Sequence, residues 1–240
     1  MAESTNKPVS QSATERVGYE VIRSRSRRRT MTLSVNRNGH VIMRVPWRTP
    51  ASEIQKFFAQ KSAWVEKRLA EIKNRPKAAP KLFRHGEEFL YLGRSYPLLL
   101  QPGNHARDPL LFTGLGFLLN EGFAAHAREA LIRWYKARAR ALIAERVDCL
   151  GGGLGLNPAG FRLVTAEFRW GSCGADNRLT FNWRLIMAPP EIIDYVIVHE
   201  LLHITNRSHS KEFWQSLEAV IPDYRERRRW LEDYGHTLKL

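Results

Sequence analysis

His199, Glu200 and His203 form an H-E-x-x-H sequence, the residue pattern in this chain with the clearest chemical meaning. Two histidines four positions apart lie one turn apart on the same face of a helix, so both imidazoles can reach one ion. Zinc prefers nitrogen ligands in a tetrahedral array, and a catalytic zinc site keeps one position for water. Glu200 then lies beside the metal, where its carboxylate can take a proton from water and return it to a leaving group.

A third candidate ligand, His209, lies six residues after His203 and completes the spacing H-E-x-x-H-x-x-x-x-x-H. Asn206 lies in the intervening turn, and asparagine tolerates the left-handed backbone that such a reversal uses. Glu218 is an alternative third ligand, which we rank below His209 because a charged residue on a helix face is commonly solvated. The spacing is shared with the metzincin proteases, but no Met follows His209, so their Met-turn is absent.

The competing interpretations of this motif are a structural zinc site and a chance group of histidines. A structural zinc usually has four protein ligands, and no cysteine is close to the motif. Burying Glu200 in the apolar segment 192–202 without a cation beside it would cost several kcal/mol of desolvation. We therefore expect a catalytic zinc centre, with Glu200 as general base and the ion on His199, His203 and His209.

Other residues near the motif are candidates for binding a substrate. Arg169, Trp170 and Ser172 end a predicted strand before the metal helix, where an edge strand can hold an extended substrate by backbone hydrogen bonds. The alternative is a turn in which Trp170 packs on the core. Tyr224 is a candidate to stabilise a charged transition state. Cys173 has no evident base partner, so we expect a buried small side chain there rather than a nucleophile.

The chain is strongly basic, with 38 Lys and Arg against 24 Asp and Glu in 240 residues, a net charge of +14. Such an excess attracts polyanions or acidic substrates, although it also suits a merely solvated surface. Strand alternation would put Arg25, Arg27 and Arg29 on one face, where they and the neighbouring Arg28 could follow phosphates. The same charges could instead protect an edge strand from aggregation.

The remaining composition favours a globular protein of the cytoplasm. Apolar residues make up 43% of the chain, which is enough for a core. Cys149 and Cys173 form no C-x-x-C pair, so neither a disulfide framework nor a thiolate zinc site is indicated. The N-terminal residues 1–16 are polar and read as a flexible tail without a secretion signal. No apolar stretch is long enough to span a bilayer, so we expect no membrane partner.

Hydrophobic periodicity predicts both strands and helices. Alternation predicts strands over residues 17–46, with a hairpin at Asn38-Gly39, over 86–120, and as a pair over 161–170 and 178–183 joined by 171–177. Helical spacing predicts helices over residues 49–74, 122–150, 189–203, 213–220 and 225–234. Ser208 or Ser210 can cap the fourth of these helices. The run Gly151-Gly152-Gly153 is expected to stop the second helix.

From Phe168 onward the sequence resembles the YgjP-like metallopeptidase family, and the early Arg-rich strands and Tyr91-Leu92-Gly93 are also similar. The stretches that carry the resemblance are Arg169-Trp170-Gly171-Ser172-Cys173, Asn182-Trp183-Arg184-Leu185, Ala188-Pro189-Pro190, Tyr195 through Leu201, Asn206 through His209, Phe213-Trp214, and Pro222 through Arg227. The resemblance implies a zincin-like region related in plan to the SprT-type proteases. It also implies zinc on the three histidines, with Glu200 as catalytic acid and base, and nucleoside triphosphate pyrophosphatase activity on UTP is attached to the family.

We therefore expect an α+β protein in which an antiparallel β-rich region, 17–121, packs on a zincin-like hydrolase core, 122–240. The leading function is zinc-dependent hydrolysis of a peptide or protein substrate. One alternative is a metal-dependent UTP pyrophosphatase that takes a nucleotide. The other is a nucleic-acid-binding module with a dormant or DNA-triggered protease site, which the basic surface would serve.

Overall fold

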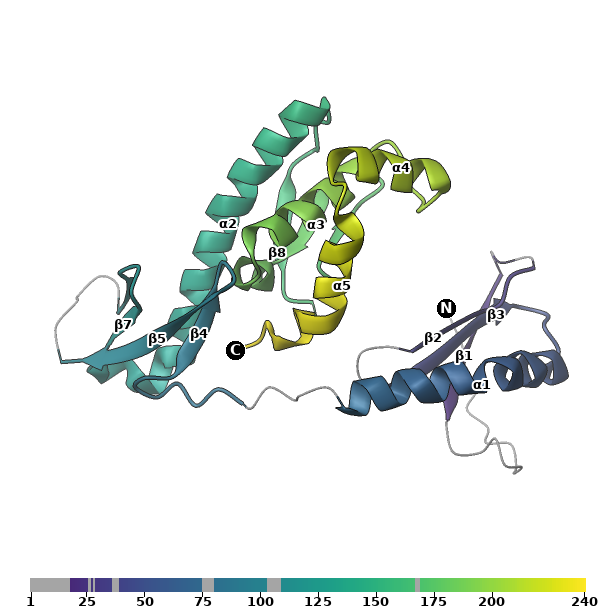
Figure 1. Cartoon of the computed structure of the whole chain (residues 1–240), viewed down its shortest axis with the longest axis horizontal. Helices are drawn as coiled ribbons and strands as arrows, with labels where there is room; N and C mark the ends of the chain where they lie inside the picture. Colours follow the sequence, from purple (N-terminus) through teal and green to yellow (C-terminus); the bar gives the residue numbers. More distant parts are fainter. Residues whose placement is uncertain are drawn as a thin grey trace. The chain divides into compact units, whose positions relative to one another are not determined.

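The computed structural model describes residues 18–25, 27, 29–35, 39–74, 80–102, 109–166 and 169–240, and they form an α+β protein (Figure 1). The chain divides into two compact units, residues 1–76 and 77–240. The sequence instead predicted a first region that extends to residue 121. The difference arises because strands between residues 88 and 120 bury their apolar side chains in one core with the later helices. The expected tail 1–16 lies outside the described residues.

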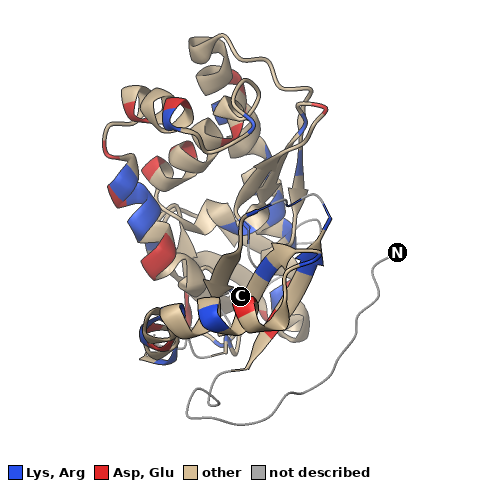
Figure 2. Cartoon of the chain, turned by 90° about the vertical axis from the view of Figure 1, so that its right-hand side faces the viewer, with Lys and Arg blue, Asp and Glu red and all other residues tan. Residues whose placement is uncertain are grey.

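The two units differ in charge. Residues 1–76 hold 16 basic and 6 acidic residues, a net charge of +10, whereas residues 77–240 hold 22 basic and 18 acidic residues, a net charge of +4. Figure 2 shows Lys and Arg in blue and Asp and Glu in red along the ribbon. The positive excess of the chain is therefore concentrated in its first third. Of the helices that the structure describes, none combines the length and apolar character needed to cross a membrane.

The first unit is a three-stranded sheet with one helix. Its elements are β1 (Tyr19–Ser24), β2 (Thr32–Val35), β3 (Val41–Pro46) and α1 (Ala51–Asn74). Alternate residues of β3 are buried, namely Val41, Met43 and Val45, and they pack in one core with Ile54 and Phe58 of α1. The period-2 pattern of the sequence predicts this burial. The helix predicted over residues 49–74 is confirmed, and it begins at Ala51.

The sheet of the first unit is mixed, not antiparallel as predicted. The strand order is β1-β3-β2, in which β3 pairs antiparallel with β2 but parallel with β1. The central strand is β3, the most apolar of the three. In this place both of its edges are hydrogen-bonded and its buried face is covered. β1 ends at Ser24, so Arg25, Arg27 and Arg29 follow the strand rather than alternate along it. Arg28 and Asn38 lie outside the described residues.

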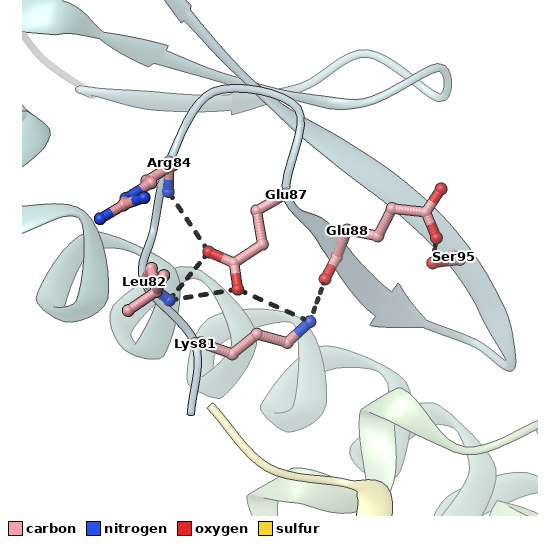
Figure 3. A network of polar contacts seen from close by, with 6 residues as sticks. All are labelled: Lys81, Leu82, Arg84, Glu87, Glu88 and Ser95. Atoms are coloured by element: carbon pink, nitrogen blue, oxygen red, sulfur yellow. Dashed lines mark hydrogen bonds and ion pairs between the residues drawn. The ribbon is translucent and has the colours of Figure 1, made fainter. Parts of the chain in front are cut away.

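The second unit begins with a four-stranded sheet of order β4-β5-β7-β6. Its strands are β4 (Glu88–Tyr91), β5 (Arg94–Gln101), β6 (Leu110–Phe112) and β7 (Phe117–Asn120). A polar network ties the segment before β4 to the β4–β5 hairpin (Figure 3). There the Glu87 carboxylate accepts hydrogen bonds from the backbone N–H groups of Leu82 and Arg84, and Ser95 Oγ donates to Glu88. These bonds fix the chain's entry into the unit.

A long helix, α2 (Ala127–Leu154), packs against that sheet and against the helix that carries the H-E-x-x-H motif. A short 3₁₀ helix over Glu121–His126 precedes it, so α2 begins later than predicted. The prediction that Gly151–Gly153 stop the helix is wrong, because α2 continues through them to a left-handed Gly155 cap at φ +65°. Gly151 is needed where it lies, since a Cβ there would be 2.8 Å from the carbonyl oxygen of Leu156.

A second small sheet of order β8-β10-β9 lies in the same unit. Its strands are β8 (Phe161–Val164), β9 (Gly171–Cys173) and β10 (Leu179–Asn182). The predicted connection 171–177 is partly wrong, because residues 171–173 are themselves a strand that pairs antiparallel with β10. β8 pairs with β10 in parallel. β9 is therefore at the edge of this sheet, and it contacts the helix that carries the motif.

The last three helices are α3 (Pro190–Leu202), α4 (Lys211–Val220) and α5 (Tyr224–Tyr234), as the periodicity predicts. α3 is buried on almost every side by the core of the unit. An ion pair between Arg146 of α2 and Asp194 of α3 joins the two helices, with Nε of Arg146 at 2.7 Å from Oδ1 of Asp194. Ser210 caps α4, since its side chain accepts from the N–H of Phe213. Figure 1 shows α3 between α2 and α5.

Candidate metal centre

Three imidazole rings converge at the end of α3. Nε2 of His209 lies 2.9 Å from Nε2 of His199 and 3.2 Å from Nε2 of His203. The three ligand atoms all lie within 4.8 Å of one another. His199 is in the last turn of α3 and His203 is its C-cap, so the helical spacing places both rings on one face. The turn that follows returns the chain and brings His209 to the same point.

The spacing of these nitrogens fits a metal ion. At zinc–nitrogen distances of about 2.0–2.1 Å, two ligands of a tetrahedral site are about 3.3 Å apart, close to both observed separations. The ring protons do not explain the arrangement. Nε2 of His209 is either a donor or an acceptor, and a proton on it can point at only one neighbour, whereas a cation between the rings accounts for both contacts.

The orientation of His203 is fixed by the turn after α3. Its Nδ1 lies 2.7 Å from the backbone oxygen of Asn206, which accepts the Nδ1 proton and leaves Nε2 as a lone pair. The prediction of a left-handed Asn206 is wrong, because this residue is not among those with positive φ. The turn is instead closed by the N–H of Asn206, which donates to the oxygen of Leu202 at 2.9 Å.

Aromatic rings of α4 hold the imidazoles in place. Phe213 is fully buried and stacks on His203 with ring centroids 4.6 Å apart. Trp214 stacks on His209 at 5.4 Å, and Tyr224 stacks on the Trp214 ring, also at 5.4 Å. The sequence pattern marked Phe213 and Trp214 as a helix face, but their contact with the histidines could not be read from it. The rings restrict the imidazoles to a narrow range of orientations.

The environment favours the neutral form of His199 and His209. Burial lowers the pKa of His199 to about 3, and repulsion by His203 and His209 acts in the same direction. Burial also lowers the pKa of His209. Neutral imidazole is the form that binds a metal. The site therefore has its nitrogen lone pairs ready well below neutral pH.

Glu200, which follows His199 in α3, is a buried carboxyl group. Only 6% of the residue is exposed. Burial raises its pKa to about 8, and the positive charge of Arg169 opposes that shift. A carboxyl with a pKa near neutral can both accept and donate a proton at physiological pH. Such perturbed groups gather at functional sites.

Gly171 of β9 makes room for this carboxyl group. A Cβ at position 171 would be 2.6 Å from Cγ of Glu200 and 2.7 Å from its Oε1, distances that real Cβ atoms do not show. The close approach places the β9 backbone directly on the Glu200 side chain. The sequence gives one signal for this residue, since Gly171 lies in the Arg169–Cys173 stretch that carries the resemblance. Its contact with Glu200 could be found only from the structure.

A family model for a YgjP-like metallopeptidase domain matches residues 29–234. The chain belongs to the YgjP-like metallopeptidase family. The match covers most of both units and includes the three histidines, Glu200 and Gly171. The family is one of metal-dependent hydrolases. No curated protein and no solved structure shows significant similarity to the chain.

In this YgjP-like chain, the predicted substrate residues lie in three different settings. Arg169 is exposed and close enough to Glu200 to influence its pKa. Ser172 is in the middle of the edge strand β9, opposite Thr180. Trp170 packs against the backbone of Gly235, as the alternative interpretation expected. The structure thus brings Arg169 and β9 to the metal centre.

Tyr224 packs on Trp214, and Glu218 lies outside the histidine group. The Tyr224 ring is 6% exposed and stacks on Trp214. Glu218 forms an ion pair with Arg225 at 2.6 Å, and it is not part of the histidine group. Among the described residues, the ligand-forming group therefore has His209 rather than Glu218 as its third member.

Arg207 joins the loop that carries His209 to the turn after β9. Its guanidinium donates to the oxygen of Gly174 at 2.6 Å, to the Cys173 sulfur at 3.2 Å, and to the side chain of Asn177. Burial raises the pKa of Cys173, so this residue stays a thiol. These contacts connect the third candidate ligand to the strand that holds Glu200 in place.

Proposed function

We propose that this protein is a zinc-dependent metallopeptidase with its ion on His199, His203 and His209. The observation that carries the proposal is the convergence of three Nε2 atoms, with the buried carboxyl group of Glu200 next to His199 in the chain. A divalent ion held there supplies Lewis acidity, which polarises a carbonyl group and makes water more acidic. Imidazole nitrogens suit zinc. Family membership supports hydrolysis of a peptide or protein substrate.

Glu200 is the proposed general base and acid. Its carboxyl group takes the proton of the attacking water and passes it to the amine that leaves when the peptide bond breaks. The raised pKa supports this role, because a group with a pKa near 8 exchanges a proton readily in both directions at neutral pH. The contact with Gly171 keeps the carboxyl in one orientation.

The edge strand β9 is the proposed binding site for the substrate backbone. Its outer side has no strand partner among the described residues, so an extended peptide can pair with it by main-chain hydrogen bonds. Ser172 lies in this strand, and Arg169 and Trp170 come immediately before it. Arg169 is placed to contact a carbonyl or carboxylate of the peptide. Tyr224 stays a candidate to stabilise a charged transition state, and its buried ring also packs on Trp214.

Replacing Glu200 tests the proposal. We expect Glu200→Gln to lower kcat for cleavage of an unfolded protein substrate by about 100-fold or more, since general acid–base catalysis contributes about 10²–10⁴. New amino termini are counted by a fluorescent amine reagent, and bound zinc is measured in the same sample. Glu226→Gln, an exposed glutamate of α5, is the matched control and should keep full activity. Undiminished cleavage by zinc-loaded Glu200→Gln would contradict the role of Glu200.

Measuring two products with the same wild-type and variant proteins distinguishes the UTP-hydrolysing alternative from the peptidase proposal. It predicts release of pyrophosphate from UTP by the wild type and none by His199→Ala. The peptidase proposal predicts amine release from protein and no pyrophosphate. Finding pyrophosphate without amine release would replace the peptide by a nucleotide as the substrate, while leaving the metal centre in place.

A further inference from the structure

One end of the sheet in the first unit gathers basic side chains. Because β1 and β3 run parallel, Ser24 and Pro46 end side by side, and β2 starts close to them since Thr32 lies opposite Arg44. The connection after β1 and the turn after β3 therefore emerge at the same end. We call this surface the basic end and define it by its exposed residues, which are Arg25, Arg29, Arg44, Trp47 and Arg48.

The turn that carries the basic end is well braced. Arg23 donates hydrogen bonds from its NH1 group to the backbone oxygens of Trp47 and Thr49, both at 2.8 Å. The N–H of Trp47 donates to the oxygen of Ser24 at 3.1 Å. The backbone of this turn is thus tied to β1 at three points, which holds Trp47 and Arg48 at a defined place beside the sheet.

Among the residues that the structure describes, the positive charges of the basic end have no acidic partner. Within the described part of the first unit, the ion pair found is Arg68–Glu71 in α1, and none involves the five residues of the basic end. Glu20 of β1 lies opposite Ile42, two residues before Arg44 on the neighbouring strand, and no ion pair joins Glu20 to Arg44. Glu53, in the first turn of α1, comes five residues after Arg48. The surface keeps a strong positive field that attracts anions.

Trp47 adds an aromatic surface to these charges. Half of the residue is exposed (50%), and the Arg25 guanidinium lies over its ring at 4.9 Å from the centroid. An exposed indole costs free energy in water unless something covers it. Arg25 covers one face of the ring, so a flat group can stack on the other. A planar base and an adjoining phosphate match such a pair of side chains.

We propose that the basic end binds single-stranded nucleic acid. The arginines contact backbone phosphates, and Trp47 stacks on a base that is free of pairing. A duplex would offer the phosphates but not an open base, so the exposed indole favours a single strand. The proposal does not rest on the peptidase function, because none of these residues belongs to the metal centre.

Anisotropy of a labelled oligothymidylate of about 12 nucleotides tests this surface with the full chain. We expect binding at low salt that weakens linearly on a log–log plot, with a slope of about −0.7 for each phosphate contacted. Trp47→Ala should weaken binding roughly 5- to 150-fold, the range for loss of one stacked base. Arg44→Gln and Arg48→Gln should each reduce the salt slope by about 0.7.

Matched controls lie on α1 of the same unit. Trp64 is 48% exposed, almost the same as Trp47, and Lys61 is an exposed cation. Trp64→Ala and Lys61→Gln should bind like the wild type, and zinc content should be unchanged in every variant. The proposal fails if no binding is seen at low salt, if the controls weaken binding as much, or if a duplex binds as tightly and Trp47→Ala changes nothing.

Discussion

At the scale of single residues, the candidate centre depends on one glycine as much as on its histidines. Gly171 and Glu200 are in van der Waals contact, and no other residue type fits at position 171 without moving the carboxyl group. The H-E-x-x-H spacing predicts the histidines and Glu200 from the sequence alone. It cannot predict Gly171, because that contact joins an edge strand to a helix that comes 17 residues or more later in the chain.

Gly171→Ala should therefore impair hydrolysis more than it impairs metal binding. The added methyl group displaces the Glu200 side chain, and we expect kcat to fall at least 10-fold, with a stability loss of about 1–3 kcal/mol from overpacking. Gly152→Ala is the control, since a Cβ there meets nothing within 4 Å and the residue is in a helix. Cleavage assays and denaturant titrations measure both effects. Full activity in Gly171→Ala would show that the contact is unimportant.

The low pKa of His199 makes the metal-free protein sensitive to acid. The folded-state pKa of about 3 is below the unfolded value of 6.5, so the neutral ring contributes stability that is complete above pH 6.5. That stability is lost as the pH falls from 6.5 toward 3. The loss is about 2 kcal/mol at pH 5, compared with neutral pH. Urea denaturation of chelator-treated protein at pH 7.5 and 5 should show this loss in the wild type and less of it in His199→Asn. Equal losses would contradict the assignment.

At the scale of elements, the periodicity of the sequence predicts the helices well and the strand pairing poorly. α1, α3 and α5 begin and end close to where their apolar spacing and capping residues place them. The parallel β1–β3 and β8–β10 pairs were not predicted, because pairing depends on which strand the tertiary core makes central. The sequence also failed to predict that α2 continues through three glycines. Gly151 is a glycine because the backbone oxygen of Leu156 leaves no room for a side chain, and that contact exists only in the folded chain.

Arg207 connects two loops of the second unit, and we expect its removal to weaken metal binding at the candidate centre. It ties the His209 loop to the turn after β9 by hydrogen bonds to Gly174, Cys173 and Asn177. We expect Arg207→Ala to weaken zinc binding about 10- to 100-fold, as for other residues that orient metal ligands. Competition with a chromophoric chelator measures the affinity.

Arg178→Ala is the control for Arg207, because Arg178 is an exposed arginine of the same turn and pairs with a carboxylate, Asp176, that is also in that turn. Arg207→Lys keeps the charge but not the forked geometry, so it should restore only part of the affinity. If Arg207→Ala and Arg178→Ala bind zinc equally well, the loop does not depend on this connection.

At the scale of the whole molecule, the candidate metal centre and most of the net positive charge belong to different units of the chain. Residues 77–240 hold the candidate metal centre, whereas residues 1–76 hold most of the net positive charge and the proposed nucleic-acid surface. Composition alone predicts the +14 charge but not its separation from the metal centre. The division of function into a β-rich region and a hydrolase core stays a prediction.

The three-histidine centre is tested most directly by the amount of zinc that the protein binds. Protein stripped by chelator and returned to excess zinc should hold about one ion per chain after gel filtration, by elemental analysis. His199→Ala, His203→Ala and His209→Ala should each hold almost none, while His126→Ala, an exposed histidine before α2, should match the wild type. A wild-type chain without zinc, or a His209→Ala chain that keeps its full ion, would contradict the site.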